Sequence, residues 1–218
     1  MSFLFELISQ GEHQQLDFKF EISDSRKIAK SLVAFANTDG GRLLIGVKDN
    51  GKIAGIRSDE EFYMIEAAAS MYCDPPVPFE YKTWPVSGKD VLEIIVSPQS
   101  NRRPFRVKLA SGKQEAYVRV HDQNILAPRF LIRYWLRQQS SKEVKLAYTQ
   151  KEKKLFDYLN DHESIRLDQL TRLVHLPNRL AEEMLLDFLM LDIIRLRISE
   201  TALDFTLNKE SRAFQPKE

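Results

Sequence analysis

One stretch of sequence decides the fold: Ala34-Phe35-Ala36-Asn37-Thr38-Asp39-Gly40-Gly41-Arg42-Leu43-Leu44-Ile45-Gly46-Val47. It closes a segment, 25–37, in which apolar residues recur at helical spacing behind a possible N-cap at Asp24 or Ser25. Gly40 and Gly41 suit a helix C-cap followed by a tight turn. The continuous apolar run 42–47 has the length of a buried strand. The stretch therefore predicts a helix, a turn and a strand in that order.

The glycine pair does not indicate nucleotide binding. A Walker loop needs Gly-Lys-Ser/Thr leading into a helix, and a dinucleotide fingerprint also runs from strand to helix. Here the glycines follow a helix and lead into a strand, which is the opposite polarity. We therefore do not expect ATP as a cofactor.

The remaining pattern alternates between helix and strand as far as residue 138. The spacing predicts a short amphipathic helix over 1–10, which lacks the basic region of a signal peptide. Further helices are expected over 59–72 and 128–137, and strands over 52–56, 77–84 and 90–96. A hairpin is expected between strands 106–109 and 115–120, across Gly112.

The pattern changes after a polar linker. Helical segments are expected over 149–160, 167–173 and 179–191, followed by a hairpin of strands 193–198 and 202–207. Three helices and a two-stranded ribbon form the order of a winged helix-turn-helix. We predict an α+β protein: a mixed α/β domain over 1–138, a linker over 139–147, a small winged-helix domain over 148–210 and a tail over 211–218.

Composition excludes several classes of protein. The 218 residues are 43% hydrophobic and 29% charged, which predicts a globular chain rather than a disordered one. The net charge of +1 gives no global preference for nucleic acid or membrane. A single cysteine, Cys73, excludes an internal disulfide, and no apolar run of membrane-spanning length occurs. We expect a cytoplasmic protein without a membrane partner.

Acidic residues near the first strand form one candidate site. Glu12 lies five residues before Asp17, and Asp17 and Lys19 share one face if that segment is extended. Asp49 follows the strand 42–47 and could approach Asp17 if the two strands are neighbours. Three carboxylates would suit Mg²⁺ or Mn²⁺ and the hydrolysis of phosphodiesters. The alternative is a solvated Asp17–Lys19 pair with Asp49 as a turn residue.

A basic segment forms the second candidate. Between Gln99 and Arg137 there are nine Lys and Arg residues, opposed only by Glu115 and Asp122. Strand alternation points Arg106, Lys108 and Arg119 outward, and helical spacing aligns Arg129, Arg133 and Arg137. Such clustering predicts contacts to phosphate, and its alternative is a solvated surface. The residues expected to contact phosphate here are Arg102, Arg103, Arg106, Lys108, Lys113 and Arg119.

The third predicted helix of the C-terminal part is poorly suited to recognise DNA bases. It carries Glu182, Glu183 and Asp187 against Arg179 alone, whereas major-groove recognition needs basic or amide side chains. Arg195 and Arg197 of the following hairpin alternate outward and could contact phosphate. Protein contact or homodimerisation is therefore at least as well supported as sequence-specific DNA recognition.

Several ordered motifs resemble the Schlafen AlbA-like domain family, which has been described as a DNA-binding or "divergent AAA" module of prokaryotic regulators. The resemblance extends from about Gly11 to Arg137, and relatives often carry a C-terminal winged helix. The motifs in this chain are Glu12 with Asp17-Phe18-Lys19, the stretch 34–41, Ile45-Gly46-Val47-Lys48-Asp49, Gly51-Lys52-Ile53-Ala54-Gly55, Arg103-Pro104-Phe105 and Tyr117-Val118-Arg119-Val120.

The resemblance implies two functions. Nuclease members use three acidic residues at the positions of Glu12, Asp17 and Asp49 for metal-dependent cleavage of structured RNA. Asp17 is one methylene shorter than the Glu usual at the middle position, which favours binding over cleavage. We therefore expect a DNA- or RNA-binding protein, a transcriptional regulator that needs no cofactor. The alternative is an endoribonuclease with Mg²⁺ or Mn²⁺.

Overall fold

The computed structural model describes residues 3–140, 144 and 149–211 and divides the chain into two compact units, 1–139 and 140–218. The first unit is a mixed α/β structure, and the second has three helices followed by a β-ribbon. The α+β character predicted from the sequence is confirmed. No helix within the described ranges is long and apolar enough to cross a membrane.

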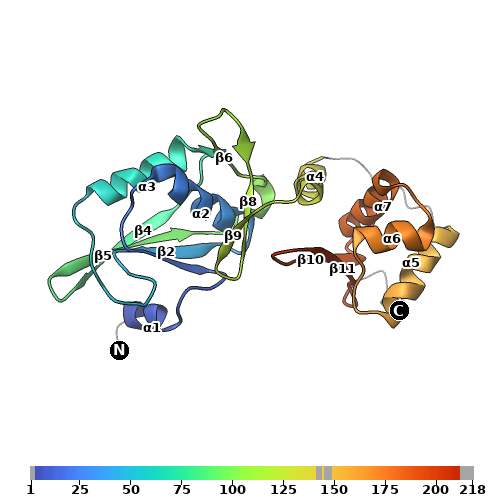
Figure 1. Cartoon of the computed structure of the whole chain (residues 1–218), viewed down its shortest axis with the longest axis horizontal. Helices are drawn as coiled ribbons and strands as arrows, with labels where there is room; N and C mark the ends of the chain where they lie inside the picture. The colour runs from blue at the N-terminus through green and yellow to red at the C-terminus, as the bar shows by residue number, and fades with distance from the viewer. Residues whose placement is uncertain (1–2, 141–143, 145–148, 212–218) are drawn as a thin grey trace. The chain divides into compact units, whose positions relative to one another are not determined.

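The first unit is built around a four-stranded sheet of order β1-β2-β5-β4. Strands β1 and β2 run parallel, whereas β5 is antiparallel to both β2 and β4. Helices α2 and α3 cover one face of this sheet and the short helix α1 lies at the other (Figure 1). The bounds of these elements are α1 Phe3–Ser9, β1 Leu16–Lys19, α2 Ser25–Asn37, β2 Gly41–Ile45, α3 Glu60–Ser70, β4 Glu80–Val86 and β5 Lys89–Val96.

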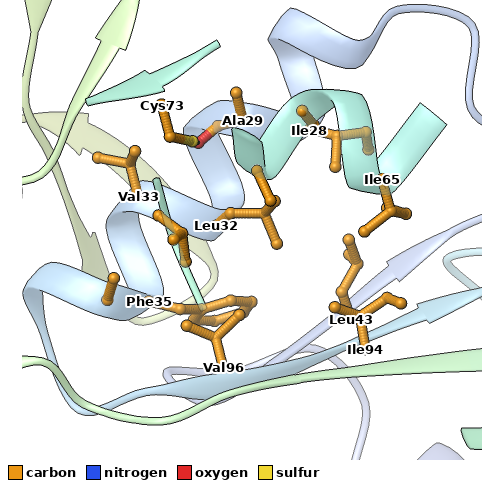
Figure 2. Close-up of a cluster of buried hydrophobic side chains, with 14 of the residues drawn as sticks. Ile28, Ala29, Leu32, Val33, Phe35, Leu43, Ile65, Cys73, Ile94 and Val96 are labelled. Atoms are coloured by element: carbon orange, nitrogen blue, oxygen red, sulfur yellow. The ribbon is translucent and has the colours of Figure 1, made fainter. Parts of the chain in front are cut away.

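Alternation along β2 assigns residues to the two faces. Leu43 and Ile45 pack into the core beneath α2 and α3, while Leu44 packs with Leu16 and Phe18 on the side of α1. In Figure 2, side chains of α2 meet Ile65 of α3 and the sheet residues labelled there. At β2 the sheet is therefore buried on both faces, which explains why residues 42–47 form a continuous apolar run.

The structure confirms both the start and the end predicted for α2. Asp24 caps the helix by accepting a hydrogen bond from the Arg26 amide at 2.8 Å. Gly40 has φ +71° and its amide donates to the Phe35 carbonyl at 3.0 Å. A Cβ at Gly41 would lie 2.4 Å from the Phe35 ring, so the chain can pass this close to α2 only without a side chain.

Two smaller sheets follow the main one. β3 Cys73–Asp74, β6 Arg106–Lys108 and β7 Gln114–Glu115 form the first, and β8 Tyr117–Val120 pairs with β9 Gln123–Leu126 in the second. The predicted hairpin across Gly112 is correct for β6 and β7, but its second strand is divided. β8 turns away after Ala116 and pairs with β9, a strand the sequence pattern did not predict. A short 3-10 helix, η1 Ser100–Arg102, lies between β5 and β6, and α4 Arg129–Gln138 is the last helix of the unit.

The second unit has the predicted order of elements. They are α5 Gln150–Asp161, α6 Leu167–Val174, α7 Asn178–Met190, β10 Ile194–Ile198 and β11 Leu203–Leu207. Thr149 and Glu152 form a capping box at the start of α5. The ribbon is antiparallel, and Ile165 adds two backbone hydrogen bonds of 2.9 Å to Phe205 on β11. These bonds fix the ribbon to the connection between α5 and α6.

Candidate functional site

The acidic residues near β1 lie around one lysine. Lys19 Nζ donates to Asp17 Oδ1 at 3.0 Å and lies 3.9 Å from Glu12 Oε1. Glu12 also accepts from the Phe18 amide at 2.8 Å, which holds its carboxylate against the outer edge of β1. Glu12, Asp17 and Lys19 therefore come together, as their spacing predicts. Asp17 is only 3% exposed, because its side chain lies on the α2 face of the sheet.

Asp17 is held by groups from three further elements. Ser31 of α2 donates to Asp17 Oδ2 at 3.2 Å, and Asn124 of β9 donates to Ser31 Oγ at 2.9 Å. Arg119 of β8 places Nη2 at 3.4 Å from Asp17 Oδ1. The same guanidinium donates to Asn124 Oδ1 at 3.1 Å and to the Leu16 carbonyl at 3.3 Å. The carboxylate is thus enclosed by a network that joins β1, α2, β8 and β9.

The two carboxyl groups are shifted in opposite directions. Burial and the neighbouring Asp17 carboxyl raise the pKa of Glu12 above its ordinary value. Burial also opposes ionisation of Asp17, but hydrogen bonding and the charges of Lys19 and Arg119 prevail and lower its pKa. At neutral pH the ionised Asp17 therefore stabilises the fold.

Asp17→Asn should destabilise the protein most at neutral pH. The lowered pKa of folded Asp17 means that its contribution is complete above its ordinary value of 3.8 and is lost as the pH falls through the folded value. The difference in unfolding free energy between wild type and Asp17→Asn, measured in urea from pH 7 to pH ~2.5, should accordingly shrink in acid. The exposed Asp49→Asn is the control, and an equal, pH-independent loss in both variants would contradict the assignment.

The structure does not bring Asp49 to this cluster. Asp49 is exposed in the turn after Val47, and nowhere in the described ranges do three His, Cys, Asp or Glu side chains group closely enough to hold a metal ion. Asp17 Oδ1 accepts a hydrogen bond from Lys19 and pairs with Arg119, and Oδ2 accepts a hydrogen bond from Ser31. The residues as arranged do not fit a three-carboxylate ion site, so we derive no reaction step through a metal. Metal binding by Glu12, Asp17 and Asp49 stays a prediction.

The expectation that Arg119 contacts phosphate is wrong. Its side chain is 2% exposed and lies beneath Phe35, with the guanidinium carbon 5.3 Å from the ring centroid. Strand alternation failed because all four residues of β8 are buried, so neither face of this strand is solvated. Arg119 is a structural partner of Asp17.

Three other predicted phosphate ligands already have partners. Arg103 donates to the Asn37 carbonyl at 3.3 Å and stacks over Trp135. Arg195 pairs with Glu210 at 2.6 Å and Arg197 pairs with Glu163 at 2.5 Å. The last two pairs are exposed and would cost little to open. Arg103 is half-buried and could leave its position only by breaking contacts to α2 and α4.

Four predicted cations remain available on one segment: Arg102, Arg106, Lys108 and Lys113. Arg106 is half-buried, the other three are exposed, and within the described part of the chain none of the four forms an ion pair with a carboxylate. Two carboxylates lie on the same small sheet: Asp74 faces Arg106 in the β3–β6 register and accepts from Gln114 at 2.8 Å, and Glu115 faces Val107 in the β6–β7 register. We call these four residues the basic segment.

Sequence reasoning missed the residues that position the basic segment. Asn37 is 1% exposed and its amide nitrogen donates to the carbonyls of Phe105 and Tyr117, at 2.9 Å each. Its Oδ1 accepts from the Phe105 amide at 2.8 Å. The end of α2 therefore holds the beginnings of both β6 and β8. The signal was an uncharged polar residue directly after the apolar, buried run 32–36 at the end of α2.

The comparison with protein families identifies the first unit. The family model for "Schlafen, AlbA_2" matches residues 12–128, more than half of the chain. The chain belongs to this family, and the resemblance seen in the sequence is confirmed. The match covers the whole carboxylate cluster and the basic segment. No curated protein matches the chain.

Two solved structures are similar to part of the chain. The first is the DIP2311 protein from Corynebacterium diphtheriae, with 24% identity and a TM-score of 0.45 over 63% of this chain and 30% of that one. The second is the N-terminal domain of a protein from Nitrosomonas europaea described as related to the ATP-dependent DNA helicase RecG. It has 22% identity and a TM-score of 0.40 over 59% of this chain and 97% of that one. The chain thus spans less than a third of the length of the first structure.

Proposed function

We propose that this protein binds the phosphate backbone of nucleic acid through the basic segment. The observation that carries the proposal is the availability of Arg102, Arg106, Lys108 and Lys113, four cations within one short stretch that no carboxylate of the described chain neutralises by ion pairing. Membership of the Schlafen, AlbA_2 family supports a role related to nucleic acid.

Contact with the phosphate backbone needs only positively charged side chains, so the four cations are sufficient for binding that does not depend on sequence. Each phosphate neutralised by Lys or Arg releases condensed counterions, and this release supplies affinity without reading sequence. Lys108 projects from β6 and Lys113 from the turn between β6 and β7, while Val107 anchors the hairpin in the core. A regulatory protein of this kind would take sequence specificity from another element or from a partner.

The second unit supports a winged-helix assignment with an unusual charge distribution. Three helices and a ribbon follow in the expected order, but α7 carries Glu182, Glu183 and Asp187 on a helix whose apolar side chains form the core. An acidic helix is repelled by the phosphate-lined major groove. We propose that this unit contributes protein contacts to a transcriptional regulator, and that Arg195 and Arg197 stay paired with their carboxylates.

Replacing Arg102, Arg106 and Lys113 together by glutamine should weaken binding to unrelated DNA or RNA sequences to a similar extent. Each lost duplex contact should flatten the plot of log affinity against log salt by about 0.9. The slope can be measured by fluorescence anisotropy with labelled duplexes between low and physiological salt. Three contacts would be lost, so the change in slope should be about 2.7.

Matched controls separate this surface from general charge. Arg57→Gln removes an exposed cation of the same unit that is paired with Glu21 at 2.7 Å, and it should leave the slope nearly unchanged. Arg195→Gln with Arg197→Gln tests the second unit in the same way. If the triple variant keeps the wild-type affinity and slope, the basic segment does not bind backbone. A loss confined to the Arg195 and Arg197 variant would transfer the role to the ribbon.

A further inference from the structure

The main sheet has two outer strands, β1 and β4, and they differ in whether the backbone groups of their free edges have hydrogen-bond partners. At β1, Glu12 accepts from the Phe18 amide at 2.8 Å and Lys19 Nζ donates to the Phe18 carbonyl at 2.7 Å. His13 exchanges backbone hydrogen bonds of 2.9 and 3.1 Å with Leu16. The outward backbone groups of β1 are thus occupied by the preceding segment and by the Lys19 side chain of β1 itself, which closes that edge.

β4 has no such cover. It spans Glu80–Val86, lies at the end of the strand order and is exposed at five of its seven residues. No other described strand pairs with its outer edge. An edge of this length presents unpaired amides and carbonyls, which is a template for adding another strand.

The turn that follows β4 determines which of its residues face outward. Val86 pairs with Lys89 across Ser87-Gly88, both of which have positive φ, as in the two-residue turns of tight hairpins. The pair flanking such a turn is hydrogen-bonded, and bonding then alternates along the strands. The backbone groups of Tyr81, Thr83 and Pro85 therefore point away from β5. Pro85, which has no amide hydrogen, fits this outward position.

We propose that β4 pairs in antiparallel fashion with β4 of a second copy of this chain, so that the two sheets join across a two-fold axis. Outward-facing residues must pair with one another, which limits the registers to Tyr81 opposite Tyr81 and its two-residue shifts. With Tyr81 on the axis, Glu80 of each copy lies opposite Lys82 of the other. This places the dimer contact in the first unit, whereas from the sequence we attached homodimerisation to the third helix of the C-terminal part.

Charge selects this register over its neighbours. A shift by two residues in one direction places Lys82 opposite Lys82, and a shift in the other direction places Glu80 opposite Glu80. Like charges directly opposite are unfavourable in antiparallel pairs, whereas opposite charges are favourable. Because β1 is closed and β4 is used once, association stops at two copies instead of growing into a chain.

Aromatic side chains add apolar surface beside this edge. Tyr81 is 58% exposed and its ring lies 4.6 Å from that of Phe62 on α3, next to Tyr63, which is 64% exposed. In the two-fold arrangement the Tyr81 side chains of both copies lie on the same face of the joined sheet, because cross-strand partners share a face. Their burial supplies the apolar contact that backbone pairing alone lacks.

The test is sedimentation equilibrium of the full chain and of charge-reversed variants. Wild type should form a dimer, and Lys82→Glu or Glu80→Lys should weaken it roughly tenfold, because the symmetry turns two attractive pairs into two repulsive ones. The double variant carrying both substitutions restores opposite charges across the axis and should recover the dimer. Asp90→Lys reverses an exposed charge on β5, away from the free edge, and should have no effect.

Each outcome decides the proposal. A wild-type chain that sediments as a monomer over the whole concentration range overturns it, as does a dimer that Lys82→Glu leaves intact. Failure of the double variant to recover association would also overturn the register. Thr83→Pro gives a second measurement, because it removes an outward amide without breaking a bond to β5, and it should abolish the dimer while the far-UV circular dichroism stays unchanged. Nucleic-acid affinity of monomeric variants reports separately on the basic segment.

Discussion

Arg119→Met should lower the free energy of unfolding by about 3–5 kcal/mol, since it breaks a buried ion pair and leaves one charge behind. Methionine fills a similar volume, so the loss reports on polar contacts rather than on a cavity. Asp17 would keep Lys19 at 3.0 Å and Ser31 at 3.2 Å, but it would lose the charge that lies deepest in the core. Few other single substitutions on this unit should cost as much.

The loss extends beyond Asp17. The guanidinium donates to Asn124 Oδ1 and to the carbonyls of Leu16 and His13, at 3.1, 3.3 and 3.4 Å. Removing it leaves Asn124 Oδ1 without this donor, and the carbonyls of Leu16 and His13 keep only the backbone hydrogen bonds that these two residues exchange. One nitrogen, Nε, already has no hydrogen-bond partner and lies buried, so the site is costly even in the wild type. The pairing with Asp17 is what offsets that cost.

Urea denaturation of wild type, Arg119→Met, Asp17→Asn and the double variant measures the coupling between the two side chains. The double variant should be less destabilised than the sum of the single changes, because no unpaired buried charge remains. Arg57→Met is the control, since it removes an exposed pair with Glu21 and should cost at most about 1 kcal/mol. A loss at Arg119 no larger than at Arg57 would refute the structural role.

Local patterns predicted this fold well where several signals in one segment agree. The helix 25–37 was predicted within its observed bounds, because a capping Asp24, a single apolar face and a terminal glycine pair all indicate the same structure. The order of the helices and ribbon in the second unit followed from periodicity in the same way. Such elements are determined by neighbours close in sequence.

Prediction failed where a strand is buried on both faces. β8 was treated as half-exposed, which placed Arg119 in solvent, and β9 was missed because Gln123 and Asn124 interrupt the apolar pattern. A positive φ at His121 lets the chain reverse between the two strands. Burial on both faces depends on how α2 packs against β8, which is a tertiary contact that strand alternation does not contain.

The candidate site shows the same division. Glu12, Asp17 and Lys19 are separated by a few residues and were placed together correctly. Asp49 belongs to a different strand end, and its position depends on the turn after Gly46. The isolated bridge between Val47 and Ile53 directs that turn, and nothing in the spacing of the carboxylates specifies it.

Asn37→Asp should destabilise the protein by about 3–5 kcal/mol, although the two side chains have the same shape, because buried groups left unpaired cost about 1–3 kcal/mol each. The amide nitrogen of Asn37 donates to the carbonyls of Phe105 and Tyr117. A carboxylate has no hydrogen to donate and would face both carbonyl oxygens with a negative charge. Only the bond accepted from the Phe105 amide would survive.

An exposed asparagine provides the matched control. Asn50 Oδ1 accepts from the Lys52 amide at 3.1 Å in a solvated turn, and an aspartate can accept the same bond, so Asn50→Asp should be nearly neutral. Thermal and urea unfolding of both variants at pH 7 measure the difference. Equal stability of Asn37→Asp and Asn50→Asp would mean that Asn37 does not hold β6 and β8. Because Arg106 of the basic segment directly follows Phe105, we also expect Asn37→Asp to weaken nucleic-acid binding while Asn50→Asp leaves it unchanged.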